Sequence, residues 1–416
     1  MTIPRTLRST LGATALVAVG ALALTACGSG FTDTSSSDSE GLTSSDDALS
    51  ILIGSSGEAE TAAVTAAVAA WSEQSGTAAS VQVASDLPQE LSQGFAAGDP
   101  ADVFYLSSDA IAGYAGNGSL KAYGDELTNK DDFYPSLVQN FTIDDQFICA
   151  PKDFSTLSLI INADLWAAAG LTDADIPTDW DQLASVAATL TTDGRAGLAF
   201  GAEYQRIGTF MAQAGGSLVT DGTAVADSSA NVEALDYVAT HLADGTFSYA
   251  ADLGAGWGGE AFGKQLSAMT IEGNWITGAL SADYPDLNYV VAPLPAGPAG
   301  AGTLQFTNCW GMAADSPNQQ AALELIEYLT STEQQLAFSD AFGPMPSILS
   351  AAEQWRTDNP DLAAFLDGAE YADFPPTQEG AAEVISDFNA QLESLSSSDA
   401  ETILGSVQSN LEAILG

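Results

Sequence analysis

The segment LSILIG, residues 49–54, decides the fold together with AETAAVTAAVAAW, residues 59–71, which follows it. The first segment is a short apolar run and predicts a buried strand, whereas apolar residues recur at helical spacing in the second. The same alternation continues through SVQV at 80–83, a further helical run, and DVFYL at 102–106. Strands that alternate with helices predict an α/β protein whose parallel or mixed sheets are covered by helices.

The residues just after these strands are candidate ligand contacts, because ligands of α/β sheets bind in crevices at the carboxyl ends of the strands. After the first strand these are residues 55–58, which end on Glu58. After the third strand they are residues 107–109, which end on Asp109.

A second series of strands and helices follows Pro151. The strand candidates are residues 155–162, 197–201, 268–271 and 288–294, and helical patterns between them include 178–190 and 229–243. Residues 319–338 predict one long amphipathic helix, and the last forty residues predict two closing helices. The folded body of about 367 residues is too long for one compact core, so two lobes are expected.

The N-terminus has the order of a secretory signal. Arg5 and Arg8 precede an apolar run from 11 to 26. At about 15 residues the run is short for a bilayer span of roughly 20, so residues 1–26 are predicted to be a signal peptide. A retained single-span anchor is the alternative.

A cysteine stands where that signal would be cut. The sequence LTAC at 24–27 resembles a bacterial lipoprotein box, in which Cys27 becomes the first residue and carries a diacylglyceryl group. Residues 28–48 are dominated by Ser, Gly, Thr and Asp and predict a flexible tether. The segment 27–48 is therefore expected to anchor the protein to the outer face of the cytoplasmic membrane, which gives it an extracytoplasmic location.

The charge balance excludes several partners. The chain has 9 Lys and Arg against 55 Asp and Glu, and two of the nine basic residues lie in the predicted signal. Such an acidic surface repels phosphate backbones and anionic lipid headgroups, so nucleic acid is not expected as a partner. Membrane attachment would come from the lipid rather than from a basic patch.

The sequence offers few residues for a catalytic site or a metal site. His241 is the only histidine, so a Ser-His-Asp triad, a Cys-His pair or a His-based metal site would depend on it, and it lies on an ordinary helical pattern. The sequence GAGWGG at 254–259 satisfies G-x-G-x-x-G, but no clear strand or βαβ unit surrounds it. We therefore expect no catalytic residues, no metal and no cofactor, and we expect the protein not to be an enzyme.

Four tryptophans lie in settings typical of loops or strand ends, namely Trp257, Trp275, Trp310 and Trp355. Core packing can explain any single tryptophan. Several of them beside glycine, asparagine and charged residues are typical of a cleft in which rings stack on sugars while carboxylates accept hydrogen bonds from hydroxyls.

Two cysteines remain in the body, Cys149 and Cys309. An even pair in an exported domain is typical of one disulfide, and two buried free thiols are the alternative.

Five segments together resemble the extracellular solute-binding proteins of sugar ABC transporters, the group that includes maltose-binding protein. They are ADVFYLSSDAIAGYAGNGSL (101–120), CAPKDFSTLSLIINADLWAAAGL (149–171), FGKQLSAMTIEGNWITGAL (262–280), CWGMAADSPNQQAALELIEYLTSTEQQLAF (309–338) and MPSILSAAEQW (345–355). The resemblance covers essentially everything from residue 49 onward and implies two hinged lobes around a central cleft. Each lobe would be a mixed or parallel sheet flanked by helices. The N-terminal lobe would comprise 49–150 plus about 312–342, and the C-terminal lobe 151–308 plus about 345–416.

The resemblance also implies site residues. Asp109 and Glu58 would contact the ligand from strand-to-helix loops, and Asp153 would point into the cleft. Glu203 and Tyr204 fall where an acidic and aromatic pair faces the sugar, and Trp275 and Trp355 fall where stacking tryptophans are found. Trp257 and Trp310 complete the ligand-binding candidates. Leu106 and Ile161 replace an aromatic pair usual in maltose-binding protein, so maltodextrin specificity is not implied.

For the cysteines, the resemblance implies a Cys149–Cys309 bridge between the two strands that cross from lobe to lobe. Such a bridge would restrict how far the lobes separate.

The function that follows is capture of a carbohydrate by lobe closure and delivery to a permease, by a monomer without cofactors. A secreted, membrane-anchored glycoside hydrolase and a scaffold lipoprotein without a ligand are the alternatives. The sequence does not name the solute, since sugars, sugar alcohols, glycosides and a cationic solute all suit such a cleft.

Overall fold

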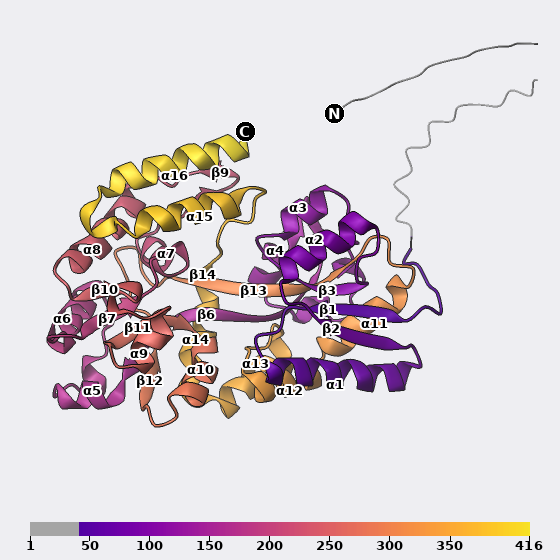
Figure 1. Ribbon diagram of the computed structural model, residues 1–416, viewed down its shortest axis with the longest axis horizontal. Helices are drawn as coiled ribbons and strands as arrows, with labels where there is room; N and C mark the ends of the chain where they lie inside the picture. Colours follow the sequence, from indigo (N-terminus) through magenta and orange to yellow (C-terminus); the bar gives the residue numbers. More distant parts are fainter. Residues whose placement is uncertain (1–40) are drawn as a thin grey trace, which may run out of the picture. The chain divides into compact units, whose positions relative to one another are not determined.

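The computed structural model describes residues 41–416, of which Leu42–Gly416 form one compact unit (Figure 1). The predicted signal peptide, the lipidation site Cys27 and residues 28–40 of the predicted tether lie outside the described residues. In the described part, no helix is long and apolar enough to cross a membrane.

A ten-stranded mixed sheet runs through this unit in the order β10-β7-β11-β6-β13-β3-β1-β2, with β12 beside β6 and β14 beside β13. Its strands are β1 (Leu49–Ile53), β2 (Ala79–Val83), β3 (Val103–Ser107), β6 (Ala150–Asn162), β7 (Ala196–Phe200), β10 (Phe247–Tyr249), β11 (Ser267–Gly273), β12 (Tyr289–Ala292), β13 (Thr303–Met312) and β14 (Ala372–Asp373). Two hairpins stand apart from it, β4 (Thr142–Ile143) with β5 (Gln146–Phe147) and β8 (Val219–Thr220) with β9 (Thr223–Ala224).

The long antiparallel strands β6 and β13 connect two halves of the sheet (Figure 1). At its C-terminal end β6 pairs with β11 and β12, whereas its N-terminal end pairs with β13. Strand β13 in turn pairs with β3 through residues 308–312. We call β6 and β13 the crossing strands.

Each half of the sheet has its own hydrophobic core. The core of the N-lobe takes residues from 49–150 and again from 309–351, and that of the C-lobe takes residues from 157–304 and again from 384–411. A third cluster, around Phe154, Ile160, Met345, Trp355 and Phe365, packs against the crossing strand β6. The two main cores agree with a two-lobed α/β fold, and the lobe boundaries stay a prediction.

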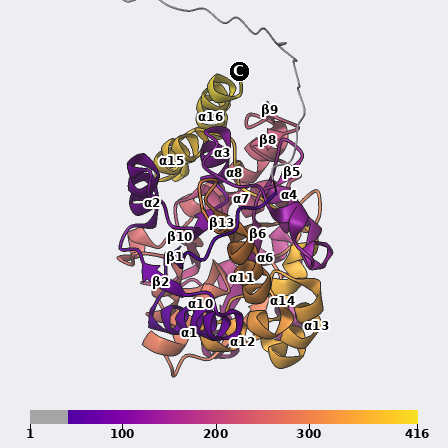
Figure 2. The same ribbon diagram turned by 90° about the vertical axis from the view of Figure 1, so that its right-hand side faces the viewer.

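Helices cover the sheet in both lobes (Figures 1 and 2). They are α1 (Glu58–Ser75), α2 (Leu87–Ala97), α3 (Ile111–Gly116), α4 (Pro135–Asn140), α5 (Ala163–Ala168), α6 (Trp180–Leu190), α7 (Tyr204–Gln213), α8 (Ser229–Ala243), α9 (Gly258–Gly263), α10 (Trp275–Asp283), α11 (Gln319–Leu329), α12 (Thr332–Phe342), α13 (Leu349–Asp358), α14 (Ala363–Asp367), α15 (Ala381–Leu392) and α16 (Ala400–Leu415). In both views α1 and α12 lie side by side beneath the N-lobe. Helices α15 and α16 confirm the two predicted closing helices.

The predicted single helix at 319–338 is wrong, because the chain forms α11 and α12 with a break between them. Ser331 has extended backbone at the break, and its Oγ accepts a hydrogen bond from the N–H of Gln334. A side chain that caps a new helix start offers the backbone an alternative to continuing the first helix.

Residues 42–48, which were expected to belong to a flexible tether, are held against the N-lobe. The Oγ1 of Thr43 donates to the carbonyl of Ser316 at 2.7 Å, and the N–H of Gln320 donates to the carbonyl of Thr43 at 2.9 Å. Asn318 adds a bond from its Nδ2 to the carbonyl of Asp47 at 3.1 Å. The polar composition that indicated a tether here instead supplies hydrogen bonds to one loop.

Candidate functional site

A cleft of about 650 Å³ lies between the lobes, with the crossing strands in its lining. This volume is within the range of small-molecule sites, roughly 300–1,000 Å³. The N-lobe lines it with residues that follow β1 and β3, and the C-lobe lines it from α7, α10 and α15. The ends of strands therefore meet the cleft, as expected for an α/β sheet.

Trp275 is the aromatic platform of the cleft. It is the first residue of α10, two positions after β11 ends, and its side chain is 40% exposed although it is large and apolar. Its ring lies edge-to-face with Phe306 of β13 at a centroid distance of 5.7 Å. A Cβ on Gly273 would lie 2.2 Å from a ring carbon of Trp275, so glycine is required for the ring to approach the end of β11 this closely.

Arg206 and Glu272 fix the orientation of that ring. The Nε1 of Trp275 donates to Glu272 at 3.0 Å, and the guanidinium carbon of Arg206 lies 5.4 Å from the ring centroid. Arg206 is itself paired with Glu272 at 2.5 Å and with Glu203 at 3.0 Å. Burial raises the pKa of Glu272, and the charge of Arg206 offsets this only in part.

On the N-lobe side, Lys152 is buried among acidic and aromatic groups. Its Nζ lies 3.3 Å from the Glu60 carboxylate, contacts the Asp153 carboxylate, and lies 4.4 Å from the centroid of the Tyr105 ring. Burial alone would lower the pKa of Lys152, but the nearby carboxylates of Asp153 and Glu60 outweigh it, so the pKa is raised and the ammonium stays charged.

The two carboxylates beside Lys152 differ. Glu60 accepts hydrogen bonds from the N–H and Oγ of Ser56, both at 2.7 Å, and from the Tyr105 hydroxyl at 3.0 Å. Burial would raise the pKa of Glu60, but Lys152 and these bonds lower it below the ordinary value. For Asp153 burial prevails and the pKa is raised, because the attraction to Lys152 compensates only part of it.

Neutral polar groups complete the lining. Asn308 comes from β13, Gln205 from α7 and Asn389 from α15. Ser107 ends β3, and Ser108 follows it. Amides and hydroxyls both donate and accept hydrogen bonds, so both lobes offer neutral donors and acceptors to the cleft.

Three of the predicted site residues come together in the cleft, namely Asp109, Asp153 and Trp275. Glu58 is exposed and lines a separate surface groove beside α1. Glu203 pairs with Arg206 outside the lining, and Tyr204 is 3% exposed and packs against Phe388.

The other predicted tryptophans do not reach the cleft. Trp310 is 1% exposed in the N-lobe core, edge-to-face with Tyr105 at 4.9 Å, and Trp355 is 2% exposed in the third cluster. Trp257 is half-buried against that same cluster. Core packing, the alternative reading of a tryptophan, describes Trp310 and Trp355, because their rings fill space between helices and crossing strands.

Sequence reasoning missed Glu60, Lys152, Gln205, Asn274, Phe306, Asn308 and Asn389 as lining residues. Lys152 and Asn308 each lie within three residues of Cys149 or Cys309, in the segments that the family resemblance assigns to the crossing strands, which is a usable signal. The residues on α7 and α15 carry no comparable signal, since a polar residue on a helix is usually a solvated one.

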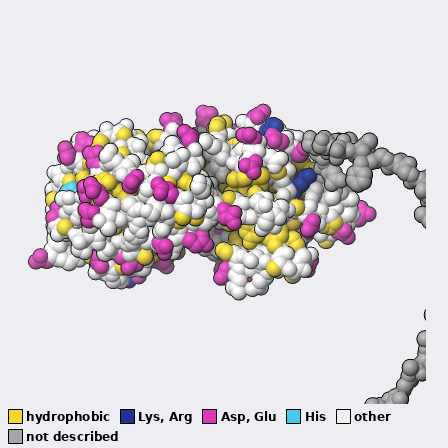
Figure 3. Space-filling view, turned by 90° about the horizontal axis from the view of Figure 1, so that it is seen from above, with side chains coloured by type: hydrophobic (Ala, Val, Ile, Leu, Met, Phe, Trp, Pro, Cys, Tyr) yellow, Lys and Arg dark blue, Asp and Glu magenta, His cyan; other side chains and the backbone are white. Residues whose placement is uncertain are grey.

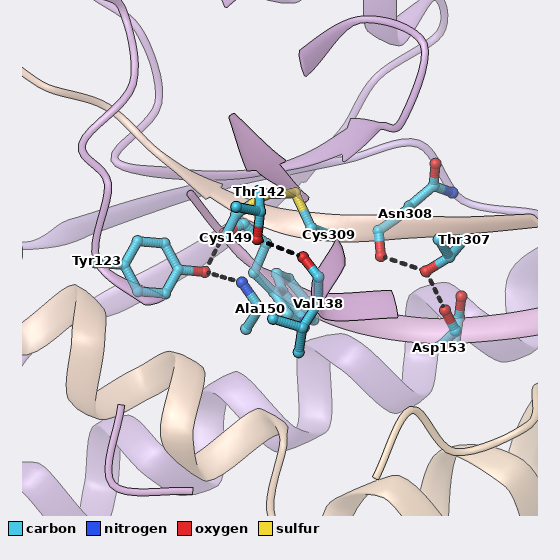
Figure 4. Close-up of a disulfide and its surroundings, with 10 residues drawn as sticks. Tyr123, Val138, Thr142, Cys149, Ala150, Asp153, Thr307, Asn308 and Cys309 are labelled. Atoms are coloured by element: carbon cyan, nitrogen blue, oxygen red, sulfur yellow. Dashed lines mark hydrogen bonds between the residues drawn. A yellow bond between two sulfur atoms is a disulfide. The ribbon is translucent and has the colours of Figure 1, made fainter. Parts of the chain in front are cut away.

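Cys149 and Cys309 form a disulfide with a Cα–Cα distance of 5.7 Å (Figure 4). Cys149 precedes β6 and Cys309 lies on β13 opposite Pro151, so the bridge joins the two crossing strands. Both cysteines are fully buried in the core of the N-lobe, and the Tyr123 hydroxyl accepts from the N–H of Ala150 at 2.9 Å beside them. The placement within one core does not support the expectation that the bridge limits lobe separation.

The comparisons with known proteins agree with this geometry. At TM-scores of 0.77 the fold is similar to the GacH receptor of Streptomyces glaucescens, solved without ligand and with acarbose (21% identity, 89% of this chain and 98% of that one). It is equally similar to an ABC substrate-binding protein of Listeria monocytogenes in complex with cycloalternan (21%, 88% and 98%). A third structure at the same TM-score is UgpB of Mycobacterium tuberculosis in complex with glycerophosphocholine (20%, 88% and 98%).

The family model that describes bacterial extracellular solute-binding proteins matches residues 66–364. That segment spans most of both lobes, and it includes the crossing strands and most residues that line the cleft. The chain belongs to the bacterial extracellular solute-binding proteins.

Proposed function

We propose that this protein is the substrate-binding component of an ABC importer, which captures a carbohydrate outside the membrane and delivers it to the permease. One observation carries the proposal: a partly exposed tryptophan, Trp275, faces a cleft that both lobes line with carboxylates, amides and hydroxyls. An aromatic face packs on the apolar face of a sugar ring, and the polar groups orient its hydroxyls.

The similar structures support this ligand class. The receptor from Streptomyces glaucescens was solved with acarbose and the Listeria protein with cycloalternan. The complex with glycerophosphocholine shows that a similar fold also takes a solute other than a sugar, so the ligand requires a direct test.

Capture follows from a population shift. A solute that contacts Trp275 on the C-lobe and Asp109 on the N-lobe makes both sets of contacts only when the lobes are closed. Its affinity is therefore higher for the closed form, and binding favours that form. The permease would then recognise the closed form, and no covalent chemistry on the solute is required.

The finer assignments belong to the same proposal. The protein acts as a monomer without enzymatic activity, anchored by lipidated Cys27 to the outer face of the cytoplasmic membrane. Such an anchor would raise the effective concentration of the protein near its permease.

A thermal-shift screen of the purified protein against sugars, sugar alcohols, amino acids and polyamines tests the proposal. A ligand at a hundred times its Kd adds about 2.7 kcal/mol, which raises the midpoint by a few degrees. We expect a shift with one class of carbohydrate. Turnover of chromogenic glycosides in a parallel assay would favour the hydrolase instead, and a shift with amino acids or polyamines alone would overturn the carbohydrate assignment.

A further inference from the structure

Two basic side chains, Lys152 in the cleft lining and Arg206 beside the ring of Trp275, are each paired with two carboxylates. Lys152 lies between Glu60 and Asp153, and Arg206 lies between Glu203 and Glu272. The Lys152 group belongs to the N-lobe and the crossing strand β6, whereas the Arg206 group supports Trp275 on the C-lobe.

These groups leave an excess of negative charge in the lining on the N-lobe side and next to Trp275 on the C-lobe side. Each contains one positive and two negative side chains, and the buried members have little solvent to screen them, with Lys152 8% and Glu272 1% exposed. Asp109, on the loop after β3, adds a carboxylate for which no ion pair is formed among the described residues. Within the described lining, no Lys or Arg lacks a carboxylate partner.

This arrangement acts on the charge of a solute. An anionic group would be moved from water next to carboxylates, and the Lys152 ammonium in the lining is already held between two of them. Both desolvation and repulsion oppose that transfer. A cationic group meets the opposite field, and the exposed ring of Trp275 offers a further attraction to it. The field is stronger in a closed cleft than on the surface, because ions of the solvent screen it less there.

We infer that the cleft selects its solute by charge, taking a carbohydrate that carries a protonated amine in preference to the neutral parent sugar, and rejecting carboxylated or phosphorylated sugars. The inference rests on the proposed carbohydrate-binding function and names the substrate class within it. The amine binds between Asp153 on the crossing strand and Asp109 on the N-lobe loop. The amides of Asn308, Gln205 and Asn389 bind the hydroxyls.

The acidic outer surface is a second source of negative field, separate from the carboxylates of the cleft. Figure 3 shows acidic side chains spread over one face of both lobes, with few basic ones among them. Charges on that surface are exposed to solvent, and salt screens them over a Debye length of about 8–10 Å at physiological ionic strength. Selection by the cleft therefore depends on its own carboxylates. Variants of cleft and surface carboxylates distinguish the field of the cleft from the field of the outer surface.

The test uses sets of three sugars that share one skeleton: glucosamine, glucose and glucuronic acid, with the galacto and manno sets and the corresponding β-1,4-linked disaccharides. Calorimetric titrations at pH 7 measure Kd at low and high salt. We expect the amine of the responding skeleton to bind at least tenfold more tightly than the neutral parent, the uronate to bind most weakly, and high salt to reduce these ratios.

The outcomes separate the two proposals. Equal affinity for amine and parent, or tighter binding of the uronate, overturns selection by charge and leaves carbohydrate capture standing. Binding of amino acids or polyamines with no response to any sugar overturns carbohydrate capture itself. If no sugar of any set binds, both selection by charge and carbohydrate capture are contradicted.

Two variants and a matched control locate the effect. Asp153→Asn and Asp109→Asn remove a carboxylate of the cleft, whereas Asp131→Asn removes an exposed one on the same lobe outside it. We expect each cleft variant to lower the ratio of amine to parent affinity by about fivefold or more, because the amine loses an ionic contact that the parent sugar never makes, and the control to leave this ratio unchanged. Asp109 is exposed, so its variant remains informative if Asp153→Asn, which disturbs the Lys152 group, folds poorly. An unchanged ratio in both would overturn the assignment of these residues.

Discussion

At the scale of single residues, the cleft depends on a few side chains that other residues hold in place. Trp275 is exposed, yet its ring is fixed by Glu272, Arg206 and Phe306, and it lies against a glycine where no larger residue fits. A ring that is already oriented loses little conformational entropy on binding, so most of its contact energy contributes to affinity.

Trp275→Ala is therefore expected to weaken carbohydrate binding by roughly 1–3 kcal/mol, or about 5- to 150-fold in Kd, with little change in the free energy of unfolding. Calorimetric titration with the solute found by screening measures the loss. Leu349→Ala is the matched control, since it also removes an exposed apolar side chain, 46% exposed, but outside the cleft. Equal affinity in the two variants would exclude Trp275 as a contact.

The variant Glu60→Gln tests how much the buried group of Lys152, Glu60 and Asp153 contributes to stability at different pH values. The pKa of Glu60 in the folded state lies below its ordinary value of 4.5, so this carboxylate contributes stability that is fully present above about pH 4.5 and is lost as pH falls through the folded pKa. At pH 7 we expect the variant to lose about 2–3 kcal/mol of unfolding free energy, because Lys152 keeps one partner fewer. Urea unfolding at several pH values should show this difference shrinking in acid.

Glu73→Gln, an exposed glutamate on the same helix, provides the comparison and should change stability by less than about 0.5 kcal/mol at every pH. A difference between wild type and Glu60→Gln that grew in acid would contradict the stated direction of the shift.

The sequence identified Asp109 and Trp275, which lie just past strand ends. It missed residues on helices, such as Gln205 and Asn389, and residues within the crossing strands, such as Lys152 and Asn308. Asp109 and Asp153 were identified from strand patterns and the family resemblance, and Trp275 follows β11 directly. Glu58 was predicted to contact the ligand, but the residue that lines the cleft is Glu60. Both residues are in the first turn of α1. Two residues apart on a helix are turned by about 200°, so the phase of the helix decides which carboxylate faces the ligand, and only packing fixes that phase.

At the scale of elements, the crossing strands join the lobes and the disulfide joins the crossing strands. The bridge lies at the N-lobe end of the pair, where β13 also pairs with β3, whereas the C-lobe pairings of β6 begin at Leu157. The disulfide does not constrain the backbone torsions of the residues between these two regions. Seven strands of the sheet, namely β1, β2, β3, β6, β7, β11 and β12, were predicted from local apolar runs. Strand β13 came only from the family resemblance, and the short strands β10 and β14 were not predicted. The break before Ser331 was missed because it depends on one capping side chain.

Replacing both Cys149 and Cys309 by alanine is expected to lower the free energy of unfolding by about 2–5 kcal/mol while Kd for the solute changes less than about twofold. Chemical unfolding and calorimetry measure the two effects. A larger radius of gyration of the ligand-free variant by X-ray scattering would show instead that the bridge restrains lobe separation.

At the scale of the whole molecule, the arrangement predicts a change of shape on binding. Lining residues come from both lobes, and the two crossing strands and the segments near the third cluster connect the lobes. Saturation with solute should lower the radius of gyration in X-ray scattering, because closure brings the lobes together. A sugar that gives no thermal shift serves as the control, and an unchanged radius with bound solute would rule out closure as the mechanism of capture.

The contacts of residues 43–47 give the two lobes unequal roles. These residues are bound to the loop at 316–319, between the end of β13 and α11, and therefore to the N-lobe alone. Any force or restraint that reaches the body through the N-terminal end of the chain enters at that loop. For a protein tethered at that end, the N-lobe would be the restrained lobe, and it would face the transporter in a limited set of orientations. The C-lobe would be the lobe that moves when the cleft opens and closes.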